Sequence, residues 1–589
     1  MLKALVNAGG VNLNITAYGA LATGSYTLIS APGGGLLNTN GSTGLFNLLP
    51  SSVGGTLSLS VSDTAVILNV TPFATPAVAY FKGGVGVDWA AFSGTNSNWT
   101  SDSAGTTNTH AVPGATTDVH FSAVGATNLN TTITQNFTIQ SLTLDGLTNA
   151  AVGIASTGGN LTINPSGSTT DPSTGLLINS GSGSLTVSAP VILGADQTWR
   201  NNSDATAVFS GGISGAAALT FGGTGTGGFL VSSTIESDVT SVTLTGSSAE
   251  LTLTGVNAFS GPLTVNSGTL TANTNAQALG IGSAVLNLAG GTVDLNAAAA
   301  LAFNRNTTVS GNATIISEKN VAGAGRHLYV RHASIGSNTL TVEGGNTATG
   351  TAGLAFGVTT FTGNATLHVD NPVAASTSTV LTLGALNDGG AATTITKSGT
   401  GTLTLATAAG TLTVGTRLNI TGGTVNSNLA TALGANVQVD VGDGGLFAAT
   451  VSQTIGALSD DTAVTHTGRV TIGGATQTLT IGGASNLSST FGGVIASATG
   501  ATASAISKQG TGTLTLTGAN TYLGATGVVA GTLRLGAVRR AADRFGRHDR
   551  QRQQRHRART RRRLHANSHR DDGHHHGRRL PAVRRRRPS

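Results

Sequence analysis

The stretch LTLTGVNAFSGPLTVNSGTL, residues 251–270, recurs much later in the chain as LTLTGANTYLGATGVVAGTL, residues 514–533. Eleven of these twenty positions are identical, and no gap is needed to align them. Phe259 falls opposite Tyr522, so the two copies also share an aromatic position. Each copy consists of two short strand-like runs joined by Gly and Asn corners. A unit that recurs in this way along one chain is typical of a solenoid built from β-strands.

The alternation inside the repeat predicts which side chains face the core. In Leu-Thr-Leu-Thr the leucines share one side of a strand and the threonines the other. We therefore expect the leucines to stack inward from coil to coil and the threonines to face water. Glycine permits the positive φ of tight corners, and asparagine tolerates such corners and can stack its amides in a ladder. The structural repeat positions are Leu251, Leu253, Gly255, Asn257, Phe259, Gly261 and Gly268, and in the second copy Leu514, Leu516, Gly518, Asn520, Tyr522, Gly524 and Gly531.

The same pattern continues through most of the chain. From about Pro113, short runs with period two end in Gly, Asn, Asp or Ser, and Gly interrupts every candidate helix. A second echo links KSGTGTLTL (397–405) with KQGTGTLTL (508–516). With roughly 20–25 residues per coil, residues 113–537 would form about 17–21 coils. The predicted fold class is an all-β solenoid followed by a disordered basic C-terminal tail.

Changes in composition divide the chain into four parts. Pro72 and Pro76 interrupt the first strand pattern, because proline cannot donate to a sheet ladder. The segment that follows holds Trp89 and Trp99, two of the three tryptophans, and terminal repeats of solenoids are usually atypical. We interpret the parts as the end of a preceding β module (1–71), a linker and aromatic-rich N-terminal cap (72–110), the β-helical repeat region (111–537) and an Arg/His-rich tail (538–589).

The composition favours a folded chain whose basic charge lies in one place. The sequence has 85 Gly among 589 residues, 39% hydrophobic residues and only 9% charged residues, a pattern of strands and turns rather than disorder. The tail from Val538 to Ser589 carries 19 Arg, four Asp and no Lys or Glu, a net charge of +15, so the remaining residues carry −8. The absence of cysteine excludes disulfides, Cys-ligated zinc and thiol catalysis.

The tail has three interpretations. Arg/His-rich sequence is what a GC-rich Gly/Thr/Ala repeat gives when it is translated out of frame, and arginine is used here without any lysine. We therefore interpret residues 538–589 as a frameshifted, disordered segment. The alternatives are an arm that binds nucleic acid or another polyanion and a metal site. The residues of that metal site would be His569, Asp571, Asp572, His574, His575 and His576.

The frameshift interpretation makes a direct prediction about the gene. Resequencing the genomic DNA across codons 530–589 should show that the other frame restores Gly-Thr-Leu repeats. A confirmed frame with a stop codon after Ser589 would contradict it. The tail would then be the first place to test polyanion and metal binding.

Two acidic pairs are candidate sites, and each has a plainer explanation. Asp460 and Asp461 are adjacent, so on a strand they would point to opposite sides, and we expect a solvated turn rather than an acid/base couple. Asp440 and Asp443 in VDVGDGG would offer oxygens to calcium, but the nonapeptide calcium repeat is absent, so we favour a structural role.

The densest basic cluster of the repeat region lies in GRHLYVRHAS and comprises Arg326, His327, Arg331 and His332. On a strand, Arg326, Leu328, Val330 and His332 would share one side, with His327, Tyr329 and Arg331 on the other. The second side is a candidate contact for an anionic sugar. We favour a charged edge that discourages pairing between sheets.

No nucleophile or phosphate-binding motif lies in its required strand-turn-helix context, and Gly-rich matches mean little at this glycine content. We therefore assign no catalytic, cofactor-binding or metal-binding residue and expect no cofactor.

The segment KQGTGTLTLTGANTYLGATGVVAGTLRLG, residues 508–536, resembles the autotransporter-associated β-strand repeat of bacterial passenger domains. Residues 251–270 and 397–425 resemble it in part, and YFKGGVGVDWAAFSGTNSNW, residues 80–99, resembles a Trp-containing spacer that precedes such repeats. The resemblance implies a right-handed parallel β-helix that is secreted and displayed at the cell surface. It implies no catalytic residues, because the repeat has none.

The repeat contains no recognisable set of catalytic residues. This favours a bacterial surface-displayed or secreted passenger-type protein with a structural or adhesive role and no catalysis. One alternative is a polysaccharide lyase or glycosidase on the same scaffold, which needs converging carboxylates. Another is a non-functional fragment of a larger autotransporter-like gene. The candidate partners are extracellular glycan, matrix or neighbouring cells. Nucleic acid is a candidate partner only if the basic tail is genuine.

For the parent protein we expect an extracellular, cell-surface or outer-membrane location. After Lys3 the apolar run is only Ala4-Leu5-Val6, too short for a signal peptide. We also expect no membrane-spanning helix, because no run of about 18 apolar residues occurs.

Overall fold

The structure is a computed structural model of the whole chain, and it describes most of the residues before the basic tail. The described residues are 11–13, 15, 23–37, 46–48, 55–146, 150–165, 173–282, 285–297, 299–318, 323–324, 327–345, 348–372, 377–406, 410–461, 463–483 and 486–536. The predicted tail, 538–589, and its metal-site candidates lie outside them. The described part forms strands, turns and loops, and it contains no helix with the length and apolar character needed to cross a membrane.

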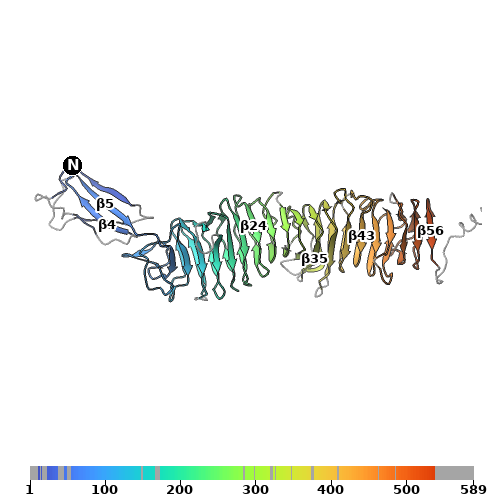
Figure 1. Cartoon of the computed structure of the whole chain (residues 1–589), viewed down its shortest axis with the longest axis horizontal. Helices are drawn as coiled ribbons and strands as arrows, with labels where there is room; N and C mark the ends of the chain where they lie inside the picture. Colours follow the sequence, from blue (N-terminus) through green and yellow to red (C-terminus); the bar gives the residue numbers. More distant parts are fainter. Residues whose placement is uncertain are drawn as a thin grey trace, which may run out of the picture. The chain divides into compact units, whose positions relative to one another are not determined.

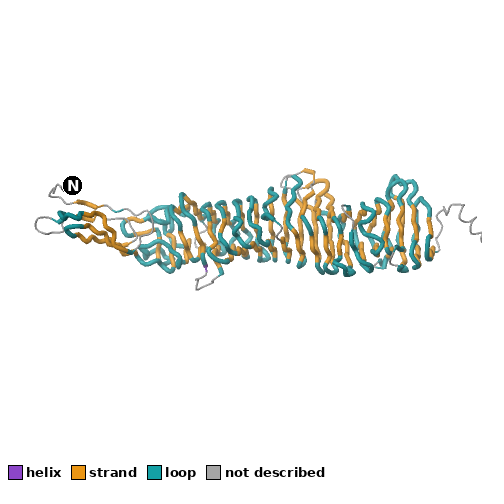
Figure 2. Tube along the Cα trace, turned by 90° about the horizontal axis from the view of Figure 1, so that it is seen from above, coloured by secondary structure: helices purple, strands orange, loops and turns teal. Residues whose placement is uncertain are grey.

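From Val78 onward the described chain winds into a parallel β-solenoid of about 17 turns (Figure 1). Successive turns pair in parallel, so that Val242 of one turn lies opposite Leu263 of the next. Strands line up along the solenoid with loops between them (Figure 2). The prediction of an all-β solenoid is therefore confirmed.

Two long sheets form two sides of the solenoid. The first sheet has 14 strands and the second has 15. The first comprises β6 (Val78–Phe81), β9 (Trp99–Thr100), β10 (Asp118–Phe121), β13 (Ser141–Leu144), β16 (Thr174–Ile178), β19 (Gln197–Asn201), β22 (Ala218–Gly222), β24 (Ser241–Leu244), β26 (Leu263–Val265), β28 (Val285–Leu288), β30 (Asn306–Val309), β34 (Ala333–Ile335), β37 (Thr359–Phe361) and β40 (Leu386–Asn387). The second comprises β11 (Asn130–Ile133), β14 (Val152–Ser156), β17 (Leu185–Val187), β20 (Ala207–Phe209), β23 (Phe229–Val231), β25 (Glu250–Leu253), β27 (Thr269–Asn273), β29 (Thr292–Asn296), β31 (Ala313–Glu318), β35 (Thr339–Gly344), β38 (Ala365–Asp370), β41 (Thr394–Ser398), β43 (Arg417–Ile420), β45 (Gln438–Val441) and β48 (Ala457–Ser459).

Shorter sheets complete the turns. The early turns add β12 (Phe137–Ile139), β15 (Leu161–Ile163), β18 (Val191–Leu193) and β21 (Ile213–Ser214). Later turns add a nine-stranded sheet of β32 (Gly323–Ala324), β33 (His327–Val330), β36 (Ala348–Phe356), β39 (Thr377–Leu383), β42 (Thr402–Leu405), β44 (Gly423–Ser427), β46 (Gly445–Ala449), β49 (Arg469–Ile472) and β52 (Val494–Ser497). The last turns hold β47 (Gln453–Ile455), β50 (Thr478–Ile481), β53 (Ala505–Lys508) and β55 (Thr526–Val528), and beside them β51 (Ser489–Phe491), β54 (Thr513–Leu516) and β56 (Thr532–Leu535).

The core is a continuous stack of apolar side chains inside the turns. In β25, Leu251 and Leu253 are fully buried and Thr252 between them is partly exposed. In β54, Leu514 and Leu516 take the same places. Each inward side chain lies opposite another inward side chain of the next turn, about 4.8 Å away along the ladder. Each turn therefore buries its apolar side largely against its two neighbours.

The middle turns have two strands each, because no described strand of a third sheet lies between β21 and β32. There the buried amide of Asn257 links three successive turns. Its Oδ1 accepts the N–H of Ile235 at 2.9 Å, and its Nδ2 donates to the carbonyl of Ala278 at 2.6 Å. In the second copy of the repeat, Oδ1 of Asn520 accepts the N–H of Ile495 at 2.8 Å. The expectation of a stacked amide ladder is wrong, because these amides bond to backbone groups of neighbouring turns.

The repeat glycines are required by close approaches between turns. A Cβ at Gly255 would overlap the carbonyl oxygen of Ser233, and one at Gly518 would overlap that of Gly493. Gly261 and Gly524 likewise lie against carbonyl oxygens of the preceding turn. Gly268 and Gly531 adopt φ of +83° and +72°, which favours glycine.

An aromatic cluster fills the first turns. Trp89 and Trp99 are fully buried, with ring centroids 5.1 Å apart and nearly perpendicular planes. The indole N–H of Trp99 donates to the carbonyl of Trp89 at 2.9 Å, and that of Trp89 donates to Thr131 at 2.9 Å. The cluster belongs to residues 72–110, and β6 within this segment already pairs with β10 of the first sheet.

Three small sheets lie outside the stacked turns. Strands β2 (Gly24–Ser30), β5 (Ala65–Pro72) and β4 (Gly55–Val61) form an antiparallel sheet. Strands β1 (Val11–Leu13) and β3 (Phe46–Leu48) pair in parallel, and β7 (Phe92–Ser93) pairs with β8 (Asn96–Ser97).

The echo between residues 397–405 and 508–516 corresponds to a buried lysine at the end of a strand. Lys397 takes an inward position in β41, where its register partners are Leu367 and Ile420, so its aliphatic stem continues the apolar stack. Its ammonium donates to the carbonyls of Ser398 at 2.6 Å, Gly399 at 3.0 Å and Gly422 at 3.1 Å.

Lys508 repeats this arrangement in β53. Its ammonium donates to the carbonyls of Gln509, Gly510 at 3.0 Å and Ala530 at 3.5 Å. In both copies the ammonium joins the turn after its own strand to the following coil. The pattern Lys-x-Gly-x-Gly therefore marks a turn closed by a buried cation.

Burial lowers the pKa of Lys397 from 10.5 to about 8. Because the folded pKa lies below the unfolded one, the unfolded chain binds more protons between these values, and stability should rise with pH from about 8 to about 10.5. We predict that the stability difference between the native chain and a Lys397→Met variant grows by up to about 3 kcal/mol across this window, at about 1.36 kcal/mol per pKa unit. Urea titrations followed by circular dichroism at a series of pH values measure it.

Lys397→Met should also be the less stable protein at every pH in this window, because three buried carbonyls lose a donor at a cost of about 1–3 kcal/mol each. A Lys397→Arg variant is the control, since a guanidinium does not titrate in this range and should abolish the rise. If stability still rises with pH in both variants, the rise comes from the titration of another group.

Candidate functional site

The outer side of the first sheet carries one continuous row of short polar side chains, which we call the polar row. The row occupies nine consecutive strands from β19 to β40, and its members are register partners from turn to turn. All of them are partly exposed. The polar row consists of Thr198, Thr220, Thr243, Thr264, Asn287, Thr308, Ser334, Thr360 and Asn387.

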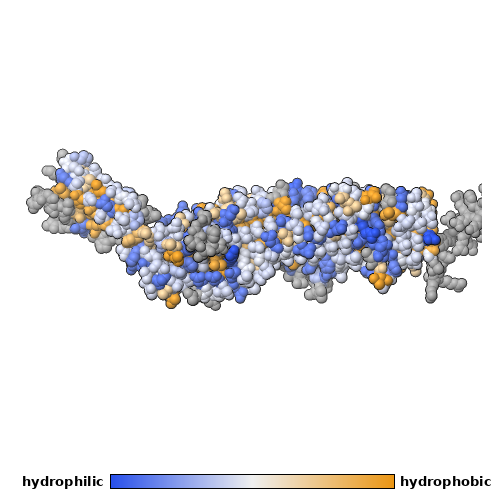
Figure 3. Space-filling view, in the orientation of Figure 1, coloured by the Kyte–Doolittle hydropathy of each residue, from blue (hydrophilic) through white to orange (hydrophobic). Residues whose placement is uncertain are grey.

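The polar row follows from the period-two pattern of the sequence. Each member lies between two buried residues, as Thr264 does between Leu263 and Val265. Parallel pairing places successive hydroxyl and amide groups about 4.8 Å apart. Such groups donate and accept hydrogen bonds but carry no charge. The row is therefore suited to binding. Figure 3 shows one side of the molecule, which is largely hydrophilic to neutral with scattered apolar patches.

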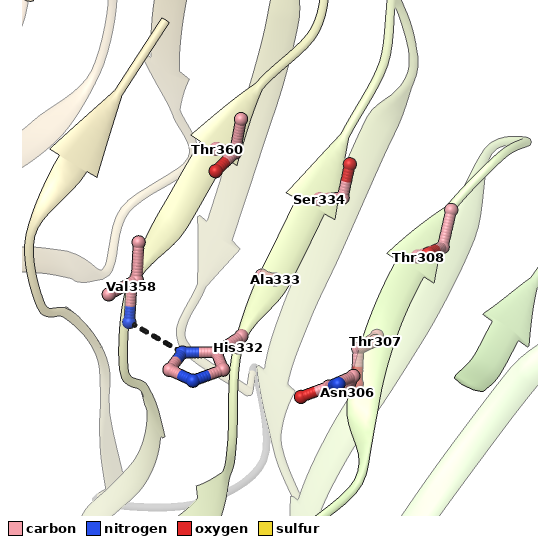
Figure 4. A pocket seen from close by; sticks show the side chains of 8 residues that line it. All are labelled: Asn306, Thr307, Thr308, His332, Ala333, Ser334, Val358 and Thr360. Atoms are coloured by element: carbon pink, nitrogen blue, oxygen red, sulfur yellow. Dashed lines mark hydrogen bonds between the residues drawn. The ribbon is translucent and has the colours of Figure 1, made fainter. Parts of the chain in front are cut away.

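A hollow of about 390 Å³ lies on the outer side of the first sheet, over β30, β34 and β37 (Figure 4). No carboxylate lines it. Its lining residues are Asn306, Thr307, Thr308, His332, Ala333, Ser334, Val358 and Thr360.

One hydrogen bond fixes the imidazole at the edge of this hollow. The N–H of Val358 donates to Nδ1 of His332 at 3.2 Å (Figure 4). A neutral imidazole that accepts at Nδ1 carries its proton on Nε2. His332 therefore presents an N–H donor at its other ring nitrogen. Strict alternation along the strand groups His332 with Leu328 and Val330, which are buried. His332 is exposed instead, because the chain turns a corner at Arg331 and His332.

Of the rest of the predicted basic cluster, only the side chain of Arg331 is described. Arg326 lies outside the described residues, and the side chain of His327 is not described. Leu328 and Val330 are buried, whereas Tyr329 is 49% exposed and Arg331 is also exposed. Strand β33 pairs only with β36 and lies at the edge of its sheet, apart from a bridge between Ala302 and Tyr329. The expectation that a charge protects this edge against sheet pairing stays a prediction.

A buried arginine lies behind this corner. Arg305 is fully buried and donates to the carbonyls of Ile281 at 3.0 Å and Gly261 at 2.8 Å, with its guanidinium 5.5 Å from the ring centre of Phe259. Burial lowers the pKa of Arg305 to about 10, so the group is charged at neutral pH. Its carbonyl accepts the N–H of Arg331 at 3.1 Å, which ties the corner to the turn below.

The adjacent acids Asp460 and Asp461 serve different contacts. Asp460 is buried, accepts the N–H of Gly492 at 2.7 Å and lies 2.7 Å from Nδ1 of His466. The expectation of a solvated turn is therefore wrong for Asp460. Asp461 is half-exposed and lies 3.4 Å from Nη2 of Arg417. The two carboxylates point to different partners, as expected for neighbouring residues.

Asp440 and Asp443 also separate. Asp440 is buried and lies 3.3 Å from Nη1 of Arg417. Asp443 accepts the N–H groups of Val464, Thr465 and Thr467 at 2.7, 2.8 and 2.9 Å, and these bonds hold the pKa of its carboxyl well below its usual value. Asp443 thus closes a loop of the following turn. Within the described part of the chain, no group of three or more His, Asp or Glu is arranged to hold a metal ion.

The sequence-predicted repeat positions build the scaffold rather than the outer face. Leu251, Leu253 and Phe259 are fully buried, and Tyr522 is partly buried with its hydroxyl 2.6 Å from that of Thr526. The hollow at His332 and the buried cations Lys397, Lys508 and Arg305 were not predicted as sites. The recurring Lys-x-Gly-x-Gly was the available signal for the two lysines.

Comparison with protein families agrees with this architecture. Residues 242–272 and 506–535 match the passenger-associated-transport-repeat, and each match covers two pairs of stacked strands, β24 to β27 and β53 to β56. No curated protein and no solved structure matches the chain. The two repeats and the parallel β-solenoid together fit an autotransporter passenger β-helix repeat protein.

Proposed function

We propose that this chain is a surface-displayed or secreted passenger segment with a structural and adhesive role and without catalysis. The observation that carries the proposal is the polar row, nine uncharged side chains in register on the outer side of a rigid sheet. Regular spacing suits a repetitive ligand such as a polysaccharide, a fibrous matrix or the same protein on a neighbouring cell. The extracellular location is part of the proposal and is supported by the two passenger-associated repeats.

The arrangement of the acids at 440, 443 and 460 supports a binding role over hydrolysis. Glycoside hydrolysis requires two carboxylates on either side of the scissile bond. Asp440, Asp443 and Asp460 are each engaged by an arginine, by backbone N–H groups or by a histidine. The hollow on the first sheet is lined by no carboxylate.

The purified full chain tests this proposal on immobilised matrix proteins, polysaccharides and whole bacterial cells. We predict saturable binding to at least one of these surfaces, with no release of reducing or unsaturated sugars from any polysaccharide. Turnover of a polysaccharide that disappears in a single Asp→Asn variant would contradict the proposal and favour the enzyme alternative. Absence of binding to every surface would remove the adhesive role.

A further inference from the structure

We propose that the hollow over β30, β34 and β37, together with the corner at Arg331, binds an acidic polysaccharide through its carboxylate or sulfate groups. This inference rests on the proposed adhesive function and gives it a ligand class and a place. The site has three parts: a grid of uncharged polar groups, a fixed N–H donor and a cation that makes no ion pair among the described residues.

The grid comes from the alternation of three neighbouring strands. The side chains of Thr308, Ser334 and Thr360 belong to the polar row, and those of Asn306 and His332 precede it on the same strands or at their starts (Figure 4). Groups in the row are about 4.8 Å apart across the turns. That spacing is close to the length of one sugar ring in an extended polysaccharide. Successive rings can therefore meet equivalent hydroxyl groups.

The donor is held in place before any ligand arrives. Nδ1 of His332 accepts the N–H of Val358, so Nε2–H is directed away from that strand. Gly357 makes this contact possible, because a Cβ there would overlap the carbonyl oxygen of Arg331 and crowd the imidazole. The N–H of Gly357 donates to the same carbonyl at 2.7 Å. The corner is thus bound to the turns on both sides.

The cation distinguishes an acidic ligand from a neutral one. Arg331 is exposed and makes no ion pair among the described residues. Its guanidinium can form paired hydrogen bonds with a carboxylate or a sulfate. The buried charge of Arg305 lies behind the same corner and adds to the positive potential, although the chain before the tail carries a net charge of −8.

An exposed aromatic ring completes the corner. Tyr329 lies on β33, two residues before Arg331, and is 49% exposed. Aromatic rings offer an apolar surface with a polar tip, which suits the C–H side of a sugar. Protection of a sheet edge would require the charge of Arg331 alone. It would not require a fixed imidazole donor or a polar hollow beside it.

The test must separate this corner from the 19 arginines of the tail. Phenylglyoxal modification of the full chain, mapped at each arginine by mass spectrometry, does so residue by residue. We predict that polygalacturonate slows modification of Arg331 by about tenfold at ten times its Kd, because only the free fraction reacts. Arg469, an exposed arginine on β49, is the internal control and should react at an unchanged rate. Neutral dextran should protect neither residue.

A matched pair of variants tests the polar part of the site. Ser334→Val should reduce the protection of Arg331, whereas Thr220→Val, in the same polar row but outside the hollow, should leave it unchanged. Valine suits a strand, so both variants should keep the fold. Equal protection of Arg469, or protection of Arg331 that survives Ser334→Val, would overturn the site. If Arg331 is not protected but the chain still binds other surfaces without turnover, the inference fails and the adhesive function stands.

Discussion

Stacking of each turn on the next is the interaction on which the rest of this structure depends. A single turn has two or three short strands and cannot bury its apolar side alone. Parallel pairing joins it to its neighbours, and the same pairing places Leu251 and Leu253 opposite Leu270 and Ala272 of the next turn. Backbone hydrogen bonds and apolar burial therefore act between the same turns. Because the register is shared, the outward residues are also aligned, and a regular core produces a regular surface.

The inside of the turns could largely be predicted from the sequence. Alternation of Leu and Thr determines which side chains are buried, and Gly marks where neighbouring backbones come close. The buried cations could not be predicted in this way, because a lysine at a period-two position usually indicates a surface. Lys397 is buried only because the carbonyls of its own turn and of the next coil lie together at the end of β41. Asn257 bonds to backbone groups because no described strand occupies the third side of its turns.

The binding face was harder to predict for a similar reason. The polar row consists of residues from nine strands, and their alignment depends on the length of every loop between them. The basic cluster can be seen in the sequence. Strict alternation continued through Arg331, however, groups His332 with the buried Leu328 and Val330, whereas His332 is exposed. The corner changes which side chains are exposed, and a corner between two sheets leaves no distinct local signal. The structure thus combines a predictable scaffold with a site that arises where the regular pattern breaks.

In-register stacking is the central claim, and disulfide trapping tests it most directly. The chain contains no cysteine, so within one molecule an introduced cysteine has only the other introduced cysteine as a partner. Thr243 and Thr264 are register partners on β24 and β26, at a separation of about 4.8 Å that a disulfide can span. Mild oxidation of a Thr243→Cys, Thr264→Cys variant should therefore give an intramolecular disulfide in nearly every molecule. The pair Thr243→Cys, Thr308→Cys, three strands apart at about 14 Å, should give none. Efficient cross-linking of the second pair, or failure of the first in a folded protein, would contradict the solenoid.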